Sequence, residues 1–198
     1  MKKQQLEIAL QKLAPLPVQS ARLEQYATPA HVAADMLWEA FTAGDVEGKS
    51  VVDLGCGNGV FAIGAKLLGA KEALGVDVDP EAVKVAMENS QTLQLIVDFQ
   101  EGDVTEISGR FDTVLQNPPF GAQTKNADRA FIKKAIELAP RTYSLHNEGT
   151  EEFVQQMVSS LGARAVLVKK YKFEIPYAFE FHTKPVETIS VVLLRFEK

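Results

Sequence analysis

The sequence predicts an α/β fold with a doubly wound, seven-stranded sheet that is mostly parallel and has its last strand antiparallel. From Ser50 onward, short apolar runs of strand length alternate with amphipathic segments of helical length. Parallel strands need such crossover connections, so the alternation indicates a parallel sheet with helices on both faces. The last two apolar runs follow each other with no helix between them and should therefore form an antiparallel pair.

The expected elements begin with a helix from about Leu6 to Leu13, which two prolines end. Thr28 followed by Pro29 is typical of a helix start, so Thr28 is predicted as the cap of a second helix that ends near Phe41. The expected strands are Val51–Leu54, Glu72–Val76, Leu95–Phe99, Phe111–Gln116, Thr142–His146, Arg164–Lys172 and Thr188–Phe196. The helices expected between them are Val60–Leu68, Pro80–Asn89, Ala127–Leu138 and Glu151–Leu161.

Length and composition indicate a single globular domain. The chain has 198 residues, of which 46% are hydrophobic and 24% charged, and no long linker or repeat divides it. We expect an N-terminal helical cap over residues 1–45 and a Rossmann-like core over residues 46–198. No apolar run is long enough to span a bilayer, so a cytoplasmic location without a membrane role is expected.

Cysteine, histidine and charge exclude several classes of site. Cys56 is the single cysteine, so no internal disulfide can form, and its place in a glycine-rich turn suggests a small packing residue. The three histidines lack the spacing of metal ligands, and no structural metal is expected. A net charge of −5 and a pI near 5.3 oppose a protein that coats nucleic acid, so any polynucleotide contact should lie on one face.

The run Asn117-Pro118-Pro119-Phe120 follows a buried strand and carries the predicted chemistry. Two prolines remove two backbone donors, so strand pairing stops and a carboxamide, carbonyls and an aromatic ring are left at the tip. A planar amine is a poor nucleophile until its lone pair is localised. The Asn117 side-chain oxygen and the Pro118 carbonyl could each accept one amine hydrogen, while Phe120 stacks on a flat substrate. The alternative is a plain turn after a strand.

The stretch Asp53 to Gly59 lies between the first core strand and its helix, where an open α/β sheet binds a nucleotide-like ligand. Gly55, Gly57 and Gly59 are spaced differently from the dinucleotide fingerprint, and Asp53 would disfavour an anion there. The turn, including Asn58, therefore favours close backbone approach by an uncharged or cationic ligand.

Acidic residues follow the next two strands. Asp77 stands where a carboxylate can accept both hydroxyls of a ribose, and Asp103 could accept a hydrogen bond from an adenine amine. Each could instead be a solvated turn residue. Asp79, followed by Pro80, is predicted to be only a helix N-cap. The order of glycine turn, acidic strand ends and Asn-Pro-Pro tip on successive strands favours a ligand-binding enzyme.

These residues resemble the class I S-adenosylmethionine-dependent methyltransferases that modify exocyclic amines. Four stretches extend the resemblance to the methyltransferase-like-five family, of which the chain resembles a compact archaeal-type member: residues 23–29 (LEQYATP), 117–121 (NPPFG), 143–146 (YSLH) and 181–184 (FHTK). The resemblance implies S-adenosylmethionine as cofactor and the 6-amino group of an adenosine in small-subunit ribosomal RNA as substrate. It also implies cofactor contacts by Gln25, Thr28, Gly55, Val60, Asp77, Asp103 and Val104. Asn58 departs from the cysteine of some members, which leaves any side-chain role there open.

The resemblance also implies two kinds of partner. RNA contacts are expected from His146, Lys170, Lys172, Phe181, His182 and Lys184. The alternatives are a core histidine at position 146 and an ordinary aromatic hairpin with solvated lysines. A small zinc-binding activator subunit is expected to pair with Leu95–Phe99, an apolar strand at the sheet edge with few protecting charges. The other reading is an edge covered by the chain's own loops.

Three other functions stay open at this point. A glutamine side-chain methyltransferase presents the same planar amine, although such enzymes usually have Tyr where this chain has Phe120. A guanine 2-amino methyltransferase is a second rival. A catalytically silent, cofactor-binding scaffold is the third, and the intact Asn-Pro-Pro tip argues against it.

Overall fold

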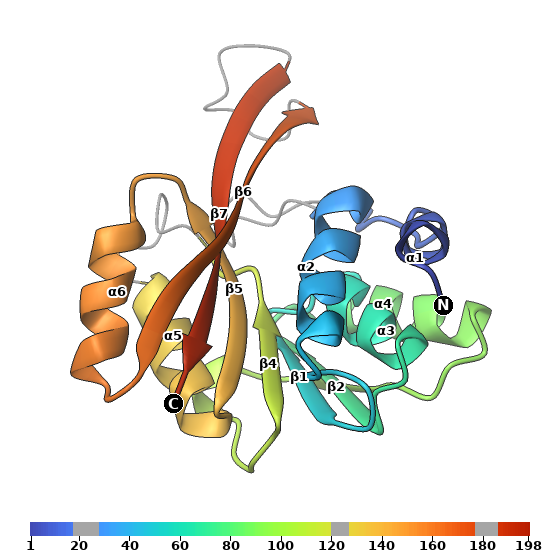
Figure 1. Cartoon of the computed structure of the whole chain (residues 1–198). Coiled ribbons are helices and arrows are strands. Elements are labelled where there is room, and N and C mark those ends of the chain that lie inside the picture. Colours follow the sequence, from blue (N-terminus) through green and yellow to red (C-terminus); the bar gives the residue numbers. More distant parts are fainter. Residues whose placement is uncertain (18–27, 120–126, 177–185) are drawn as a thin grey trace.

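The computed structural model describes residues 1–17, 28–119, 127–176 and 186–198 (Figure 1). Its centre is one seven-stranded sheet with the order β3-β2-β1-β4-β5-β7-β6. The strands are β1 (Ser50–Leu54), β2 (Glu72–Asp77), β3 (Asp98–Glu101), β4 (Thr113–Gln116), β5 (Arg141–Asn147), β6 (Arg164–Pro176) and β7 (Val186–Glu197). The helices are α1 (Lys3–Leu10), α2 (Ala30–Thr42), α3 (Val60–Leu67), α4 (Pro80–Thr92), α5 (Ala127–Leu138) and α6 (Glu151–Ser160), with a 3-10 turn η2 (Val104–Glu106).

Strand pairing confirms the predicted fold class. β1 is parallel to both β2 and β4, and the pairs β2–β3 and β4–β5 are parallel as well. β7 runs antiparallel to β5 and to β6. The chain order reverses between β1 and β4, so the carboxyl ends of these strands form the edge where sheets of this kind bind ligands.

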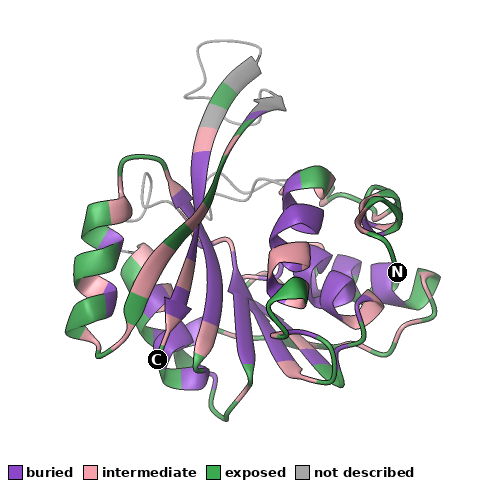
Figure 2. Ribbon diagram, viewed as in Figure 1, coloured by how far each residue is buried: buried purple, intermediate pink, exposed green. Residues whose placement is uncertain are grey.

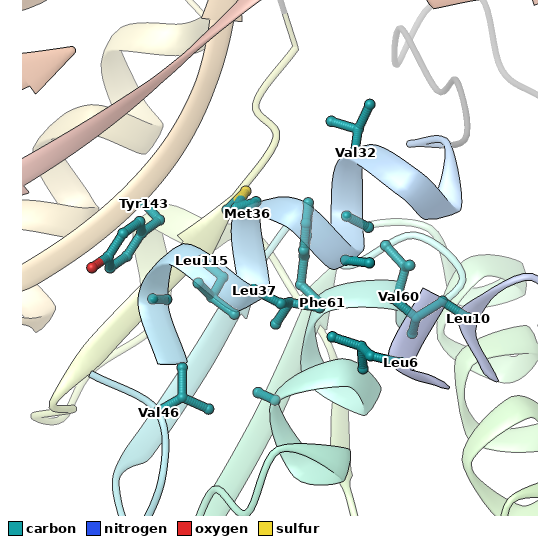
Figure 3. Close-up of a cluster of buried hydrophobic side chains, with 14 of the residues drawn as sticks. Leu6, Leu10, Val32, Met36, Leu37, Val46, Val60, Phe61, Leu115 and Tyr143 are labelled. Atoms are coloured by element: carbon teal, nitrogen blue, oxygen red, sulfur yellow. The ribbon is translucent and has the colours of Figure 1, made fainter. Parts of the chain in front are cut away.

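Apolar side chains fill both sides of the sheet. α1, α2 and α3 pack on one face, where Leu37, Phe61 and Tyr143 are almost fully buried (Figure 3). α5 and α6 cover the other face through two further clusters, one with β1 and β4 and one with β7. Figure 2 shows the central strands almost entirely buried, because helices cover them on both sides. The site edge therefore stands on a rigid core.

Two elements, α1 and β3, begin three residues away from their predicted positions. α1 begins at Lys3 and ends at Leu10, three residues earlier than expected, because the Gln5 side chain accepts a hydrogen bond from the Lys2 N–H and stabilises the helix start. The prediction of a strand over Leu95–Phe99 is wrong in its bounds, since β3 begins at Asp98. Leu95 donates its N–H to the Ser90 carbonyl and so belongs to the turn that ends α4.

The last two strands are longer than predicted and form an extended hairpin. The last residue of β5, Asn147, pairs with Val191, so the pairs from Lys172 and Ser190 onward have no β5 residue beside them. This part of the hairpin projects from the body on the side of the carboxyl ends of the parallel strands (Figure 1). In the part of the chain that the structure describes, no helix has both the length and the apolar character needed to cross a bilayer.

Candidate active site

The glycine turn joins β1 to α3 and is held by backbone bonds to the end of β2. The N–H groups of Gly55 and Cys56 both donate to the Val76 carbonyl, at 2.8 and 2.9 Å. The Gly57 N–H donates to Asp77 Oδ2 at 2.9 Å. The turn is therefore fixed against the neighbouring strand before any ligand is present.

The turn is crowded at one glycine and open at another. A Cβ on Gly59, where φ is +85°, would lie 3.0 Å from Phe99 Cζ and 3.1 Å from both Ala86 Cβ and Ile63 Cδ1. Gly57 has φ of +53° and no heavy atom within 4 Å of the equivalent position. The open space above Gly57 lets a ligand approach the backbone closely, so the turn fits a bound nucleoside-like cofactor.

Asp53 lies beneath the turn and is completely buried. Its Oδ2 accepts a hydrogen bond from the Ala62 N–H at 3.1 Å, while Oδ1 has no partner among the described residues. Burial, and to a lesser extent the charge of Asp77, raises the pKa of Asp53 to about 8. A buried acceptor without a partner is costly, and a cationic ligand nearby would favour the ionised form of Asp53, which then accepts a hydrogen bond.

Asp77 is the last residue of β2 and is 7% exposed. Besides the bond from Gly57, its Oδ1 accepts the Asp79 N–H at 3.0 Å. Burial raises the pKa of Asp77, although these backbone donors partly oppose the effect. Asp79 itself accepts the Glu81 N–H at 3.0 Å and precedes Pro80, so its prediction as a helix N-cap is confirmed.

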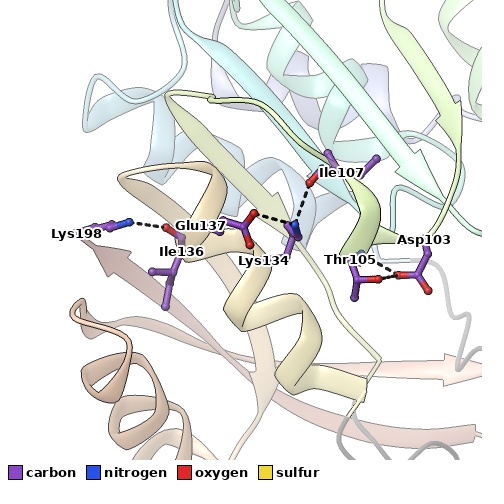
Figure 4. A network of polar contacts seen from close by, with 7 residues as sticks. All are labelled: Asp103, Thr105, Ile107, Lys134, Ile136, Glu137 and Lys198. Carbon is purple, nitrogen blue, oxygen red and sulfur yellow. Dashed lines mark hydrogen bonds and ion pairs between the residues drawn. The ribbon is translucent and has the colours of Figure 1, made fainter.

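Asp103 follows β3 and begins the 3-10 turn η2. Its Oδ1 accepts hydrogen bonds from the Thr105 hydroxyl (2.7 Å) and N–H (2.8 Å), which lower the pKa of Asp103 (Figure 4). Val104, beside it, is 7% exposed. The Lys134 ammonium donates to the Ile107 carbonyl at 3.0 Å and ties this loop to α5. Asp103 is therefore held in place and ionised at neutral pH, which suits it to accept a hydrogen bond.

The Asn-Pro-Pro tip follows the last residue of β4. The Asn117 Nδ2 donates to the Thr28 hydroxyl at 3.0 Å, which joins the tip to the chain just before α2. The prediction of Thr28 as a helix cap is wrong: Pro29 occupies the cap position without a side-chain bond, and the Thr28 hydroxyl accepts from Asn117 instead. Phe120 and Gln25, which sequence reasoning places in the site, lie outside the described residues.

A buried polar chain runs from the base of the tip to β5. The Gln116 Nε2 donates to Ser144 Oγ at 3.0 Å, and that hydroxyl shares a hydrogen bond with His146 Nε2 at 2.7 Å. His146 is 3% exposed, and burial lowers the pKa of His146 to about 4. The structure therefore places a neutral, bonded histidine inside the protein, and this ring presents almost no surface for a contact with RNA.

The lysines expected to contact RNA have different surroundings. Lys170 Nζ lies 3.0 Å from Glu148 Oε1 and 3.5 Å from Glu151 Oε1, so a phosphate there would compete with two carboxylates. Lys172 is exposed where the hairpin projects beyond β5. Phe181, His182 and Lys184 lie outside the described residues.

Two residues near the glycine turn escaped the sequence analysis. Asn89, on α4, is 5% exposed and donates from Nδ2 to the carbonyls of Ala14 and Asn58, at 3.1 and 3.0 Å. Ala14, just beyond α1, also accepts from Asn58 Nδ2 at 3.1 Å. The one signal in the sequence was an asparagine at the end of an amphipathic helix, where an apolar residue would be ordinary.

Cys56 is 3% exposed, and burial raises the pKa of its thiol well above the ordinary value. A protonated, enclosed thiol is a poor nucleophile, which supports its interpretation as a small packing residue. Within the described ranges no group of His, Cys, Asp and Glu side chains gathers in a way that could hold a metal ion.

Comparison with known proteins identifies the family. The model of the methyltransferase small domain matches residues 30–175. The chain is 41% identical to MJ0284 of Methanocaldococcus jannaschii, over 100% of this chain and 95% of that protein. It is 34% identical to the rRNA N(6)-adenosine-methyltransferase METTL5 of Danio rerio, over 99% of each chain.

A solved structure gives the same result. PH1948 of Pyrococcus horikoshii, for which an RNA methyltransferase activity has been proposed, superimposes with a TM-score of 0.91 at 42% identity over 100% of this chain and 97% of that one. The resemblance drawn from the Asn-Pro-Pro tip and the glycine turn is therefore confirmed, and the fold and the match agree with S-adenosylmethionine as cofactor. The chain belongs to the methyltransferase small-domain family and, within it, to the family of the METTL5 proteins.

Proposed function

We propose that this protein transfers a methyl group from S-adenosylmethionine to the 6-amino group of an adenosine in ribosomal RNA, and that this RNA is the one of the small ribosomal subunit. The observation that carries the proposal is the Asn117 carboxamide, which the Thr28 hydroxyl holds directly before Pro118 and Pro119 at the carboxyl end of β4. The full-length similarity to a protein named as an rRNA N(6)-adenosine-methyltransferase supports the choice of adenosine over other planar amines.

The cofactor would supply an electrophilic methyl group, and the residues around the glycine turn would hold it. Gly57 offers open backbone, Asp53 an unpartnered acceptor for an ammonium, and Asp77 a fixed carboxylate for ribose hydroxyls. Asp103 would accept a hydrogen bond from the amine of the cofactor's adenine. We assign the remaining contacts to Gly55, Asn58, Gly59, Val60 and Val104 from the same turn and loop, and to Gln25 and Thr28.

The tip would act by positioning. The bond from Asn117 Nδ2 to Thr28 fixes the rotation of the carboxamide and directs its oxygen to the opposite side, where it would accept one hydrogen of the substrate amine. The Pro118 carbonyl would accept the other, so that the nitrogen lone pair points at the methyl group. Phe120 would stack on the flipped base. The amine becomes acidic once methylated and releases its proton to water, so no general base is required.

The projecting hairpin is the surface we assign to RNA. It extends past β5 on the side of the proposed site, and Lys172 is exposed on it. A lysine there can contact phosphates without entering the site, as positioning contacts do. Phe181, His182 and Lys184, at the end of the same hairpin in sequence, would add stacking and further phosphate contacts. The cytoplasmic location expected from the sequence stays a prediction.

We also propose that a small zinc-binding activator subunit pairs with β3. This strand is an edge of the sheet, and among the described residues it pairs with β2 only. Beside it, Ile96 is 83% exposed, and Met87 on α4 is 45% exposed. The strand carries Glu101 as well as Asp98, which already lay in the predicted range Leu95–Phe99, so the edge is more acidic than expected. A partner strand with basic residues would complement it.

The test is a methylation assay on the purified protein. Protein and methyl-labelled S-adenosylmethionine are incubated with ribosomal RNA and total protein, and the RNA is digested to nucleosides. We expect label in 6-methyladenosine, and its loss in Asn117→Ala with cofactor binding retained. Gln156→Ala, which removes an exposed carboxamide on α6, is the matched control and should keep full activity.

Each rival predicts a different result. Label in 2-methylguanosine or in protein would replace the adenosine assignment by the guanine or the glutamine alternative. Cofactor binding without any transfer, even after addition of the activator, would leave the scaffold function. For the activator itself, a monomeric protein with full activity and no gain from that subunit would refute the pairing at β3.

A further inference from the structure

Besides its bonds to β2, the glycine turn has a second anchor, the side chain of Asn89 on α4. Asn89 is buried near the end of α4, and its carboxamide makes three hydrogen bonds to backbone groups. Its Oδ1 accepts the Ala14 N–H at 2.8 Å, and its Nδ2 donates to the carbonyls of Ala14 (3.1 Å) and Asn58 (3.0 Å). The carboxamide thus pairs with Ala14 as a neighbouring peptide group would.

Asn58 lies in the turn between Gly57, where the backbone is open, and Gly59, where it is crowded. Its own Nδ2 also donates to the Ala14 carbonyl at 3.1 Å, so turn, α4 and N-terminal segment form one closed set of hydrogen bonds. Gly57, on one side, is fixed to Asp77. Two side chains therefore hold the backbone around Gly57 in position: Asp77 at the end of β2 and Asn89 on α4.

The N-terminal segment is itself firmly docked. Leu6 and Leu10 of α1 are 0% and 4% exposed and join the cluster that contains Val60 and Phe61 of α3 (Figure 3). Ala14 comes four residues after the end of α1, and Leu13, just before it, packs against the same cluster, so this contact restrains Ala14 as well. Asn89 thus binds the turn to a part of the chain that the core already holds.

We propose that Asn89 is a positioning residue for the cofactor: it holds the Asn58 carbonyl and Ala14 together and so keeps the turn in its binding conformation. This inference rests on the proposed function, because it takes the turn as the cofactor site. Loss of the carboxamide leaves the carbonyls of Ala14 and Asn58 without a shared donor, and the turn can then relax. The effect should fall on cofactor binding, because Asn89 forms hydrogen bonds to the turn and to Ala14.

The experiment compares Asn89→Ala with Ser90→Ala in the full-length protein. Ser90 is also buried on α4, but its hydroxyl donates only within its own helix, to the Met87 carbonyl at 2.8 Å. We expect Asn89→Ala to raise the Kd and the KM for S-adenosylmethionine by about tenfold or more, as the loss of one to three hydrogen bonds implies. The kcat at saturating cofactor should change by less than about twofold, because the lost contacts would stabilise the bound ground state and the transition state equally. Ser90→Ala should lower Tm without changing either constant.

Two further measurements keep the inference testable if Asn89→Ala is poorly folded. Asn58→Ala removes one of the four bonds and leaves the three of Asn89, so it should raise the Kd less than Asn89→Ala or Asn89→Asp. Amide hydrogen exchange at Ala14 reports the anchor without any cofactor and should accelerate in Asn89→Ala only.

The possible results distinguish failure of the positioning role of Asn89 from failure of the proposed methyltransferase function. A wild-type protein that binds no S-adenosylmethionine in calorimetry would refute the proposed function. Wild-type binding together with an unchanged Kd in a folded Asn89→Ala would refute the positioning role alone. A fall in kcat with KM unchanged would do so too, because it would place the effect at the tip.

Discussion

Replacing Gly57 by alanine separates the cost of a strained backbone from the cost of blocking the cofactor. Gly57 has φ of +53°, and no heavy atom lies within 4 Å of the position its Cβ would take, so alanine clashes with nothing in the protein. The left-handed conformation costs an L-residue roughly 1–2 kcal/mol. For a chain of 198 residues, this corresponds to a fall in Tm of roughly 2–8 °C.

The matched control is Gly149→Ala, in the turn between β5 and α6. Gly149 has φ of +93° and is equally open, so the substitution should cost the same range of stability. Gly59→Ala provides the crowded case, because its Cβ would lie 3.0 Å from Phe99 Cζ. Overpacking adds roughly 1–3 kcal/mol, so this variant should have the lowest Tm of the three.

Gly57→Ala, unlike Gly149→Ala, should weaken cofactor binding by more than its loss of stability explains. The added methyl group would occupy space that the proposed cofactor needs, and an overpacked contact of this kind weakens binding by about tenfold or more. Thermal unfolding without ligand gives the first quantity, and calorimetric titration with S-adenosylmethionine gives the second. If Gly57→Ala loses stability as expected but binds the cofactor like the wild type, or if Gly149→Ala loses as much affinity, the cofactor does not lie over Gly57.

Three further predictions concern buried groups. Burial raises the pKa of Asp53 to about 8, so the folded state holds a proton that the unfolded chain releases above about 4. Wild-type stability should therefore fall as the pH rises between these values, and Tm profiles of Asp53→Asn should lack that slope. His146 has the opposite sign: its pKa is lowered to about 4, so stability should fall as the pH drops from about 6.5 towards 4, and His146→Asn should remove the effect from acid titrations of Tm. Alanine at Gly75 would bring Cβ within 2.5 Å of Phe99 Cδ1, so Gly75→Ala should be strongly destabilised in urea unfolding, and adding Phe99→Ala should recover part of the loss instead of summing with it.

Local features of the chain were predictable from the sequence. The alternation of strands and helices fixed the sheet class, because hydrophobic period and crossover connections are written along the chain. Asp79 before Pro80 was confirmed as an N-cap, since a cap contacts residues only two positions away. The glycine turn and the Asn-Pro-Pro tip could be placed at one edge for the same reason: each directly follows a strand.

Contacts between distant residues required the tertiary structure. Thr28 was assigned to its own helix, but its hydroxyl accepts from Asn117, 89 positions away. The edge strand was placed too early because Leu95 is used to end α4, which its apolar character does not reveal.

The anchor at Asn89 belongs to the same class, because its partners come from separate parts of the sequence. Local propensity and spacing thus determined which elements form and which end of the sheet bears the chemistry. The packing of α1 and α4 around the turn decided which polar side chains hold that end in place, since hydrogen-bond partners far apart in sequence become neighbours only after the sheet and its helices have assembled.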